Sequence, residues 1–213
     1  MTRLQDEDIA ALAAHLEVPL AAEQRDRLHD YLALLQRWNA TYNLTAVREP
    51  QAMFTQHLAD CLAVVPGVWR HAAGGRMLDV GSGGGLPGVV IACALPGWDV
   101  TCVDAVGKKA AFVRQVAGSL SLANLHASHA RVESLKGAPF QLIVSRAFAS
   151  LADFVALTRP HLAPGGAWMA MKGRAPDDEI AALPAGIDVF HVEQLAVPGL
   201  NAQRCLVWMR PRA

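Results

Sequence analysis

The chain has 213 residues, of which 53% are hydrophobic and 18% are charged. These proportions exclude an intrinsically disordered chain and a coiled-coil fibre, and no apolar run approaches the roughly 18 residues of a membrane span. The acidic N-terminus lacks the apolar core of a signal peptide, so we expect a cytoplasmic protein without a membrane partner. Lys plus Arg and Asp plus Glu number 19 each, a balance that argues mildly against nucleic-acid binding.

The balanced charge conceals a difference between the two parts of the chain. Residues 1–75 carry 6 basic and 9 acidic side chains, whereas residues 76–213 carry 13 and 10. Because opposite charges attract, an anionic partner is expected at the second part.

Cysteines and histidines show no metal-site pattern. The four cysteines lie in apolar segments and form no C-x-x-C pair, which predicts reduced core residues without disulfides or a zinc site. The histidines, such as His126 and His129, show no ligand constellation. We therefore expect no metal.

The first 75 residues predict a helical extension. Two helices are expected within the first 40 residues, because apolar side chains recur at helical spacing in the second. Pro50 opens a further expected helix over 50–64, and Pro66-Gly67 and Gly74-Gly75 bracket its exit. We therefore predict an N-terminal helical extension over 1–75 and a main domain over 76–213.

From Arg76 onward, apolar strand-like runs alternate with helical stretches, which predicts a parallel sheet with helices on both faces. The expected strands are 77–80, 100–103, 125–127, 142–144 and 167–171, and the expected helices are 88–95, 107–121 and 151–162. The last two runs, 187–197 and 204–210, are too close for a crossover helix and predict an antiparallel hairpin. The expected fold is α/β and Rossmann-like, a mostly parallel seven-stranded sheet with an antiparallel strand near the C-terminus, as in class I methyltransferases.

The segment over 78–88 reads LDVGSGGGLPG and lies at a predicted strand-to-helix turn. So many glycines are typical of a loop whose backbone approaches a ligand, since a turn alone needs one or two. The G-x-G-x-x-G frame of Gly83, Gly85 and Gly88 would bind a dinucleotide. The D-x-G-x-G-x-G frame that starts at Asp79 fits better, because a carboxylate can hold the ammonium group of S-adenosylmethionine but repels a phosphate.

Asp104 ends the next predicted strand, about 20 residues beyond the glycine loop, where a carboxylate can accept both ribose hydroxyls of an adenosine. The alternative is that Asp104 caps the helix expected from Gly107. Both nucleotide classes use such an acid, so Asp104 indicates an adenosine cofactor without distinguishing between them.

Several motifs occur in a specific order along nearly the whole chain. They are Asn43-Leu44-Thr45-Ala46, His57-x-x-Asp60, the glycine segment, Val103-Asp104 with Lys108-Lys109, Arg131-Val132-Glu133, and Ser145-Arg146-Ala147 followed by Lys172-Gly173. This pattern resembles the RsmG (GidB) family of bacterial 16S ribosomal RNA guanine-N7 methyltransferases. The segment after Asp104 departs from the Ser-Leu-x-Lys-Arg type, a change that should affect neither the fold nor the ribose contact.

The resemblance implies a cofactor, a partner and the residues that bind them. The cofactor is S-adenosyl-L-methionine, and the partner is 16S ribosomal RNA within the small subunit or an assembly intermediate, bound by a monomer. Gly81 and Leu86 would line the methionine end, Asp104 the ribose, and Val132 and Glu133 the adenine. The alternative interpretation of Glu133 is an ordinary charged residue on the solvated surface. The expected cofactor-binding residues are Asp79, Gly81, Gly83, Gly85, Leu86, Asp104, Val132, Glu133 and Arg146.

Ser145 and Arg146 directly follow the fourth expected strand, and ligands of open α/β sheets meet at such strand ends. We expect both residues to be catalytic, with a strand-end salt bridge as the alternative for Arg146. Pyrimidine C5 methylation requires a cysteine nucleophile at such a strand end, and none of the four cysteines lies there. Amine methylation would show an Asn/Asp-Pro-Pro-aromatic tetrad at this place, and the chain has none. Guanine N7 carries an unprotonated lone pair, so its methylation needs positioning and no general base.

With the resemblance, Asn43, Thr45, His57 and Asp60 are expected to border the substrate mouth. Lys172, at the end of the fifth expected strand, would bind the substrate by adding positive charge for the RNA backbone. Without the resemblance, a capped helix, a satisfied polar pair and ordinary surface charge would explain these residues. The predicted function is methyl transfer from S-adenosylmethionine to guanine N7 of 16S ribosomal RNA. A small-molecule methyltransferase and a non-catalytic ribosome-assembly RNA-binding factor are the alternatives. An NAD-dependent oxidoreductase ranks last, because no Tyr-x-x-x-Lys follows the loop.

Overall fold

The computed structural model describes residues 6–146, 148 and 150–212. The α-helices are α1 (Asp6–His15), α2 (Ala22–Tyr42), α3 (Pro50–Met53), α4 (Asp60–Leu62), α5 (Val65–His71), α6 (Gly88–Ala94), α7 (Gly107–Ser119), α8 (Leu151–Thr158) and α9 (Asp177–Ala181). A π-helix, η1 (Phe54–Ala59), joins α3 to α4, and η2 (Val132–Ser134) and η3 (Arg159–His161) are 3₁₀ turns. The strands are β1 (Gly75–Val80), β2 (Trp98–Asp104), β3 (Leu125–His129), β4 (Phe140–Ser145), β5 (Leu162–Lys172), β6 (Ile187–Leu195) and β7 (Arg204–Pro211).

The strands form one seven-stranded sheet in the order β3-β2-β1-β4-β5-β7-β6. The first five strands pair in parallel, and β7 pairs antiparallel with both β5 and β6. The α/β fold with an antiparallel C-terminal strand and hairpin is thus confirmed. From β5 the chain passes to the edge strand β6 and returns as β7, which fills the position between them.

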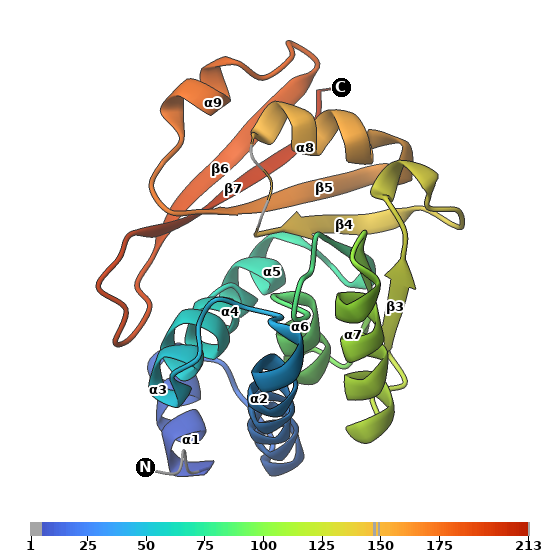
Figure 1. Ribbon diagram of the computed structural model, residues 1–213. Coiled ribbons are helices and arrows are strands. Elements are labelled where there is room, and N and C mark those ends of the chain that lie inside the picture. Colours follow the sequence, from blue (N-terminus) through green and yellow to red (C-terminus); the bar gives the residue numbers. More distant parts are fainter. Residues whose placement is uncertain (1–5, 147, 149, 213) are drawn as a thin grey trace.

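Side chains alternate between the two faces of the sheet, as a strand period of two requires. Met77 belongs to one buried cluster, with apolar residues of α1, α2 and α4–α7. Its neighbour Leu78 belongs to the other cluster, together with Phe154 of α8. Figure 1 shows the corresponding layers, with α2 and α4–α7 on one side of the sheet and α8 and α9 on the other. The expected helices on both faces are confirmed.

The structure differs from the expected boundary near residue 66. Pro66-Gly67 was expected to close the preceding helix, and this is wrong because the helix α5 begins at Val65 with Pro66 in its first turn. Proline is well tolerated there, since the first turn needs no amide donor. Ile9 and Leu58 share one buried cluster with Val90 and Met169, so the N-terminal helices and the sheet are packed on a common core. The division at residues 75 and 76 stays a prediction.

The four cysteines, Cys61, Cys93, Cys102 and Cys205, are buried and free, as their apolar settings predicted. None of the helices within the described residues combines the length and the hydropathy that a membrane span requires.

Candidate active site

The glycine loop connects β1 to α6 at the carboxyl edge of the sheet. Gly81, Gly83 and Gly85 have φ angles of 69°, 58° and 84°, a region that side chains disfavour. A Cβ on Gly85 would lie 2.3 Å from Cγ2 of Val89, whereas a Cβ on Gly83 would have its nearest neighbour, the carbonyl oxygen of Gly81, at 4.0 Å. Gly85 is therefore required by packing, and Gly83 adjoins open space.

Backbone contacts hold the loop against the next strand. The amides of Gly81 and Ser82 donate to the carbonyl oxygen of Val103 over 2.9 and 3.3 Å. The amide of Gly83 donates to Oδ2 of Asp104 over 2.9 Å. The loop conformation thus depends on the residues that end β2.

Asp104 fixes both the loop and the turn that precedes α7. Its Oδ1 accepts from the amide of Val106 over 2.8 Å, two residues further along the chain. Val106 is the N-cap residue of α7 and this helix has no side-chain cap among the described residues, so the alternative that Asp104 caps the helix is wrong. The Nζ atom of Lys109 lies 3.8 Å from Oδ2 of Asp104. Since a carboxylate offers about four lone-pair sites, these contacts leave capacity for ligand hydroxyls.

A cavity lies beside this carboxylate, and we call it the loop cavity. Its lining residues are Val80, Gly81, Val103, Asp104, Ala105, Ala130, Arg131, Val132, Glu133, Phe148 and Leu157. Four of the expected cofactor residues, Gly81, Asp104, Val132 and Glu133, are among them. The other five lie outside this lining. Asp79, Gly83, Gly85 and Leu86 lie in or under the glycine loop, and Arg146 lines a second cavity.

Asp79 is fully buried beneath the loop. Its Oδ2 accepts from the amide of Gly88 over 2.8 Å, whereas Oδ1 has no hydrogen-bond partner among the described residues. Burial raises the pKa of Asp79 to about 7, although the Gly88 amide and the Arg146 guanidinium oppose the rise. A buried carboxylate oxygen without a donor fits a nearby cationic ligand group such as an ammonium.

A second cavity, the basic cavity, is lined by Gln56, His57, Asp60, Arg146, Met171, Lys172, Gly173 and Arg204. One of these lining residues, the buried Asp60, pairs with two guanidinium groups. Oδ1 lies 2.8 Å from Nε of Arg204, and Oδ2 lies 3.3 Å from Nη1 of Arg146, which also donates to the carbonyl oxygen of Gln56. The salt bridge considered for Arg146 therefore exists, and the same side chain also lines a cavity.

His57 is neutral and held in one orientation. Its Nδ1 lies 3.0 Å from the carbonyl oxygen of Gln56, which can only accept, so Nε2 accepts from the hydroxyl of Thr45 over 2.8 Å. Burial lowers the pKa of His57, and the Arg146 guanidinium lowers it further. The π-helix η1 carries His57, and π-turns are frequent at functional sites.

Asn43 and Thr45 lie outside the lining of the basic cavity. Asn43 ends α2 with a φ of 50°, and its side-chain oxygen accepts from Arg48. Thr45 is a half-buried partner of His57. Their contacts are those of a helix cap and a satisfied polar pair.

Ser145 and Lys172 are placed differently at the ends of their strands. Ser145 is buried, and its hydroxyl donates to the carbonyl oxygen of Val80 over 2.9 Å, so it connects β4 to β1 and lines neither cavity. Lys172 lines the basic cavity, and its ammonium group pairs with Glu179 of α9 at 2.8 Å. Ala147 of the Ser-Arg-Ala triplet lies outside the described residues.

A family model described as rRNA small subunit methyltransferase G, GidB, matches residues 24–207. The chain belongs to the GidB family. Two similar proteins, both named Ribosomal RNA small subunit methyltransferase G, are each 60% identical to this GidB chain. The relative from Acidovorax sp. (strain JS42) aligns over 93% of this chain and 92% of its own length, and that from Leptothrix cholodnii over 96% and 95%. The expected family is confirmed.

Solved structures of methyltransferases share the fold of this GidB chain. The glycopeptide N-methyltransferase MtfA superposes with a TM-score of 0.61 at 16% identity, covering 77% of this chain and all of that one. TrmN from Thermus thermophilus superposes with a TM-score of 0.56 at 19% identity, covering 71% of this chain and 49% of that one. The expected Rossmann-like methyltransferase fold is confirmed.

The sequence did not single out Arg204, Gln56 or Tyr31 as site residues of this GidB chain. Arg204 lies 144 positions from Asp60 and reaches it only because β7 returns beside β5. Tyr31 donates from α2 to the glycine loop. No local motif marks such contacts, since they depend on the order of strands and on helix packing.

Proposed function

We propose that this protein transfers the methyl group of S-adenosylmethionine to N7 of a guanine in 16S ribosomal RNA. The main support is that the loop cavity and the basic cavity lie together at the carboxyl ends of the parallel strands. Gly81 follows β1, Asp104 ends β2, Arg146 follows β4 and Lys172 ends β5. Lys172 lines the basic cavity and Phe148 lines the loop cavity. The Nζ atom of Lys172 lies 3.5 Å from the carbonyl oxygen of Phe148, so the two cavities are neighbours. Ligands of open α/β sheets bind at this edge.

The glycine loop would bind the methionine end of the cofactor. When bound, S-adenosylmethionine supplies an electrophilic methyl group on a sulfonium sulfur. Gly81, Gly83 and Gly85 let the backbone approach it, and Oδ1 of Asp79 accepts from its ammonium group. Leu86 is buried, so its contribution comes from its backbone.

The adenosine part would lie in the loop cavity. The remaining lone pairs of Asp104 accept the ribose hydroxyls, and the exposed Glu133 and the main chain of Val132 recognise the edge of the adenine. Amides already fix the Asp104 carboxylate in place, so little reorganisation is needed when the ribose binds.

The basic cavity would bind the RNA. Arg146 and Arg204 are oriented by Asp60, and a planar guanidinium can bind phosphate in a bidentate manner or stack on a base. Guanine N7 is unprotonated, so the residues need only align it with the methyl group. His57 is neutral and bonded to Thr45, which suits positioning rather than proton transfer. Ser145 would support the site indirectly, by connecting β4 to β1 through Val80.

The two alternative functions predict different observations. A small-molecule methyltransferase would be expected to close an apolar pocket over the cofactor, whereas the neighbouring cavity is lined by His57, Asp60, Arg146, Lys172 and Arg204. A non-catalytic assembly factor would not need to bind the cofactor. Calorimetric titration with S-adenosylmethionine distinguishes a non-catalytic assembly factor from both methyltransferase hypotheses.

The decisive experiment is to incubate the protein with labelled S-adenosylmethionine and three substrates. These are small ribosomal subunits from cells lacking the protein, their assembly intermediates and naked 16S RNA. We expect label at one guanine, which borohydride and aniline then cleave as N7-methylguanine. Label on an exocyclic amine, or none on any RNA, would contradict the proposal. We further propose that a monomer acts in the cytoplasm, since one chain provides both cavities.

A further inference from the structure

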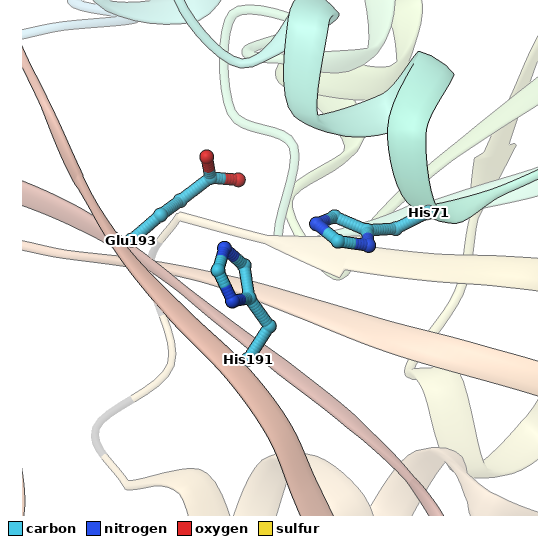
Figure 2. A group of neighbouring side chains, drawn as sticks. All are labelled: His71, His191 and Glu193. Atoms are coloured by element: carbon cyan, nitrogen blue, oxygen red, sulfur yellow. The ribbon is translucent and has the colours of Figure 1, made fainter.

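Three potential metal ligands from distant parts of the chain converge at the β6 edge of the sheet. His71 ends α5, and His191 and Glu193 lie two positions apart on the edge strand β6. One ligand atom from each side chain lies within 4.8 Å of the other two. Figure 2 shows the two imidazole rings and the carboxylate turned toward one gap. None of these residues lines the loop cavity or the basic cavity.

The imidazole of His71 provides the second observation. Its Nε2 is buried and has no hydrogen-bond partner among the described residues. A buried polar atom without a partner costs free energy and is rare in folded proteins, so it calls for an explanation. We propose that His71, His191 and Glu193 bind a divalent transition-metal ion of the Zn²⁺ type.

The donor chemistry fits this ion. Two imidazole nitrogens and one carboxylate oxygen are typical zinc ligands, with a water molecule in the fourth position. Zn–N and Zn–O bonds of about 2.0 to 2.2 Å place tetrahedral ligands about 3.3 Å apart. The observed separations, up to 4.8 Å, exceed this distance, so the side chains would move toward one another when the ion binds. His191 is exposed, which gives the ion a path from solvent.

Glu193 already has two partners. The indole Nε1 of Trp208 donates to Oε1 over 3.1 Å, and Arg70 pairs with Oε2. A carboxylate retains lone pairs beside such contacts, and the Trp208 bond fixes its orientation as supporting hydrogen bonds do at metal sites. The Arg70 charge opposes a cation, but its side chain is 56% exposed and can turn into solvent. Arg70 should therefore weaken the site without blocking it.

The bound ion would connect α5 to the edge strand β6. Because α5 leads directly into β1, such a link would fasten the last helix before the sheet to its outermost strand. The sequence predicted no metal, since 120 positions separate His71 from His191 and no local ligand spacing exists.

The test is titration of tag-free, chelator-treated protein with Zn²⁺ alone, followed by calorimetry and by thermal unfolding. We expect one Zn²⁺ per chain and a midpoint of unfolding about 5 to 10 °C higher at a hundredfold excess over the dissociation constant. His191→Ala and His71→Gln should each weaken binding by about tenfold or more. The matched control is His126→Ala, which removes an exposed histidine of β3 at the other edge of the sheet.

Arg70→Gln provides an independent measurement. Removing the positive charge beside Glu193 should tighten Zn²⁺ binding, because the three proposed ligands are unchanged in this variant and the cation is no longer repelled. A wild-type protein that binds no Zn²⁺ would overturn the proposal, as would binding that survives both His71 and His191 variants or is lost in His126→Ala. Unchanged or weaker binding by Arg70→Gln would remove Glu193 from the ligand set.

Discussion

Tyr31 of α2 donates a hydrogen bond of 2.7 Å from its hydroxyl to the carbonyl oxygen of Gly84, 53 positions further along the chain. The tyrosine ring is fully buried, and its centroid lies 6.4 Å from that of Phe112 in α7. An N-terminal helix thus fixes the glycine loop, in addition to the contact from Asp104.

Tyr31→Phe tests this connection, since it keeps the ring and removes only the hydroxyl. We expect the free energy of unfolding to fall by about 1 kcal/mol and cofactor affinity to fall severalfold, because the Gly84 carbonyl loses its donor. Denaturant unfolding and calorimetry measure the two effects. Tyr42→Phe, at an exposed position of the same helix, is the control and should change neither quantity.

Gly83→Val should abolish cofactor binding. A β-branched side chain resists the positive φ and would project into the space that the cofactor is proposed to fill. Gly74→Val is the matched control, because Gly74 also has a positive φ and open surroundings but lies outside the loop. Both variants should lose stability, and only Gly83→Val should lose cofactor binding by calorimetry. Normal affinity in Gly83→Val would mean that the loop is only a turn.

Asp104→Ala should weaken cofactor binding by about 1 to 3 kcal/mol, since the ribose hydroxyls lose a charged acceptor and the amides of Gly83 and Val106 lose theirs. Asp99→Ala is a suitable control, because Asp99 lies on the same strand and is 43% exposed in a pair with His126. Calorimetry on folded protein provides the comparison. Unchanged affinity in Asp104→Ala would exclude this residue from the cofactor site.

Cofactor affinity should depend on pH through Asp79. Burial raises the pKa of this carboxyl to about 7, so it is mostly protonated at pH 6 and mostly ionised at pH 7.5. If the ionised form binds the cofactor ammonium, affinity rises about five- to tenfold over this interval, and binding releases a proton. Asp79→Asn retains an acceptor for the Gly88 amide and should remove both effects. Calorimetry in buffers of different ionisation enthalpy measures the proton release, and a pH-independent wild type would contradict this role.

Arg146→Ala should lower methyl transfer to ribosomal RNA by about tenfold or more, because a charge-assisted contact and the alignment of the base are lost. Arg146→Lys should rescue it only in part, since an ammonium group cannot reproduce a planar, bidentate contact. Asp60 keeps Arg204 as a partner, so the midpoint of thermal unfolding should change little.

Arg204→Ala should also reduce transfer, whereas Arg210→Ala is the control from the far end of β7, where Arg210 pairs with Asp188. Transfer is measured as the initial rate with labelled cofactor for the four variants Arg146→Ala, Arg146→Lys, Arg204→Ala and Arg210→Ala. Full activity of Arg146→Ala, or a loss explained by unfolding, would make Arg146 a structural ion-pair partner.

The sequence by itself determined the alternation of strands and helices and indicated where a cofactor site is expected. Alternating apolar runs encode strands, because neighbouring side chains such as Met77 and Leu78 must be buried on opposite faces. The glycine loop and Asp104 were found because a close backbone approach and a strand-end carboxylate are local properties. The order of short motifs then indicated the family.

The tertiary structure decided which side chains meet and which are already engaged. Ser145 ends a strand, where catalytic residues are expected, yet its hydroxyl donates to the carbonyl oxygen of Val80. Asp60 meets Arg204 only because the last strand inserts between β5 and β6. Contacts of this kind join residues many positions apart, and their geometry follows from strand order and helix packing. No local pattern of residues encodes them, because burial and hydrogen bonding depend on the whole folded chain.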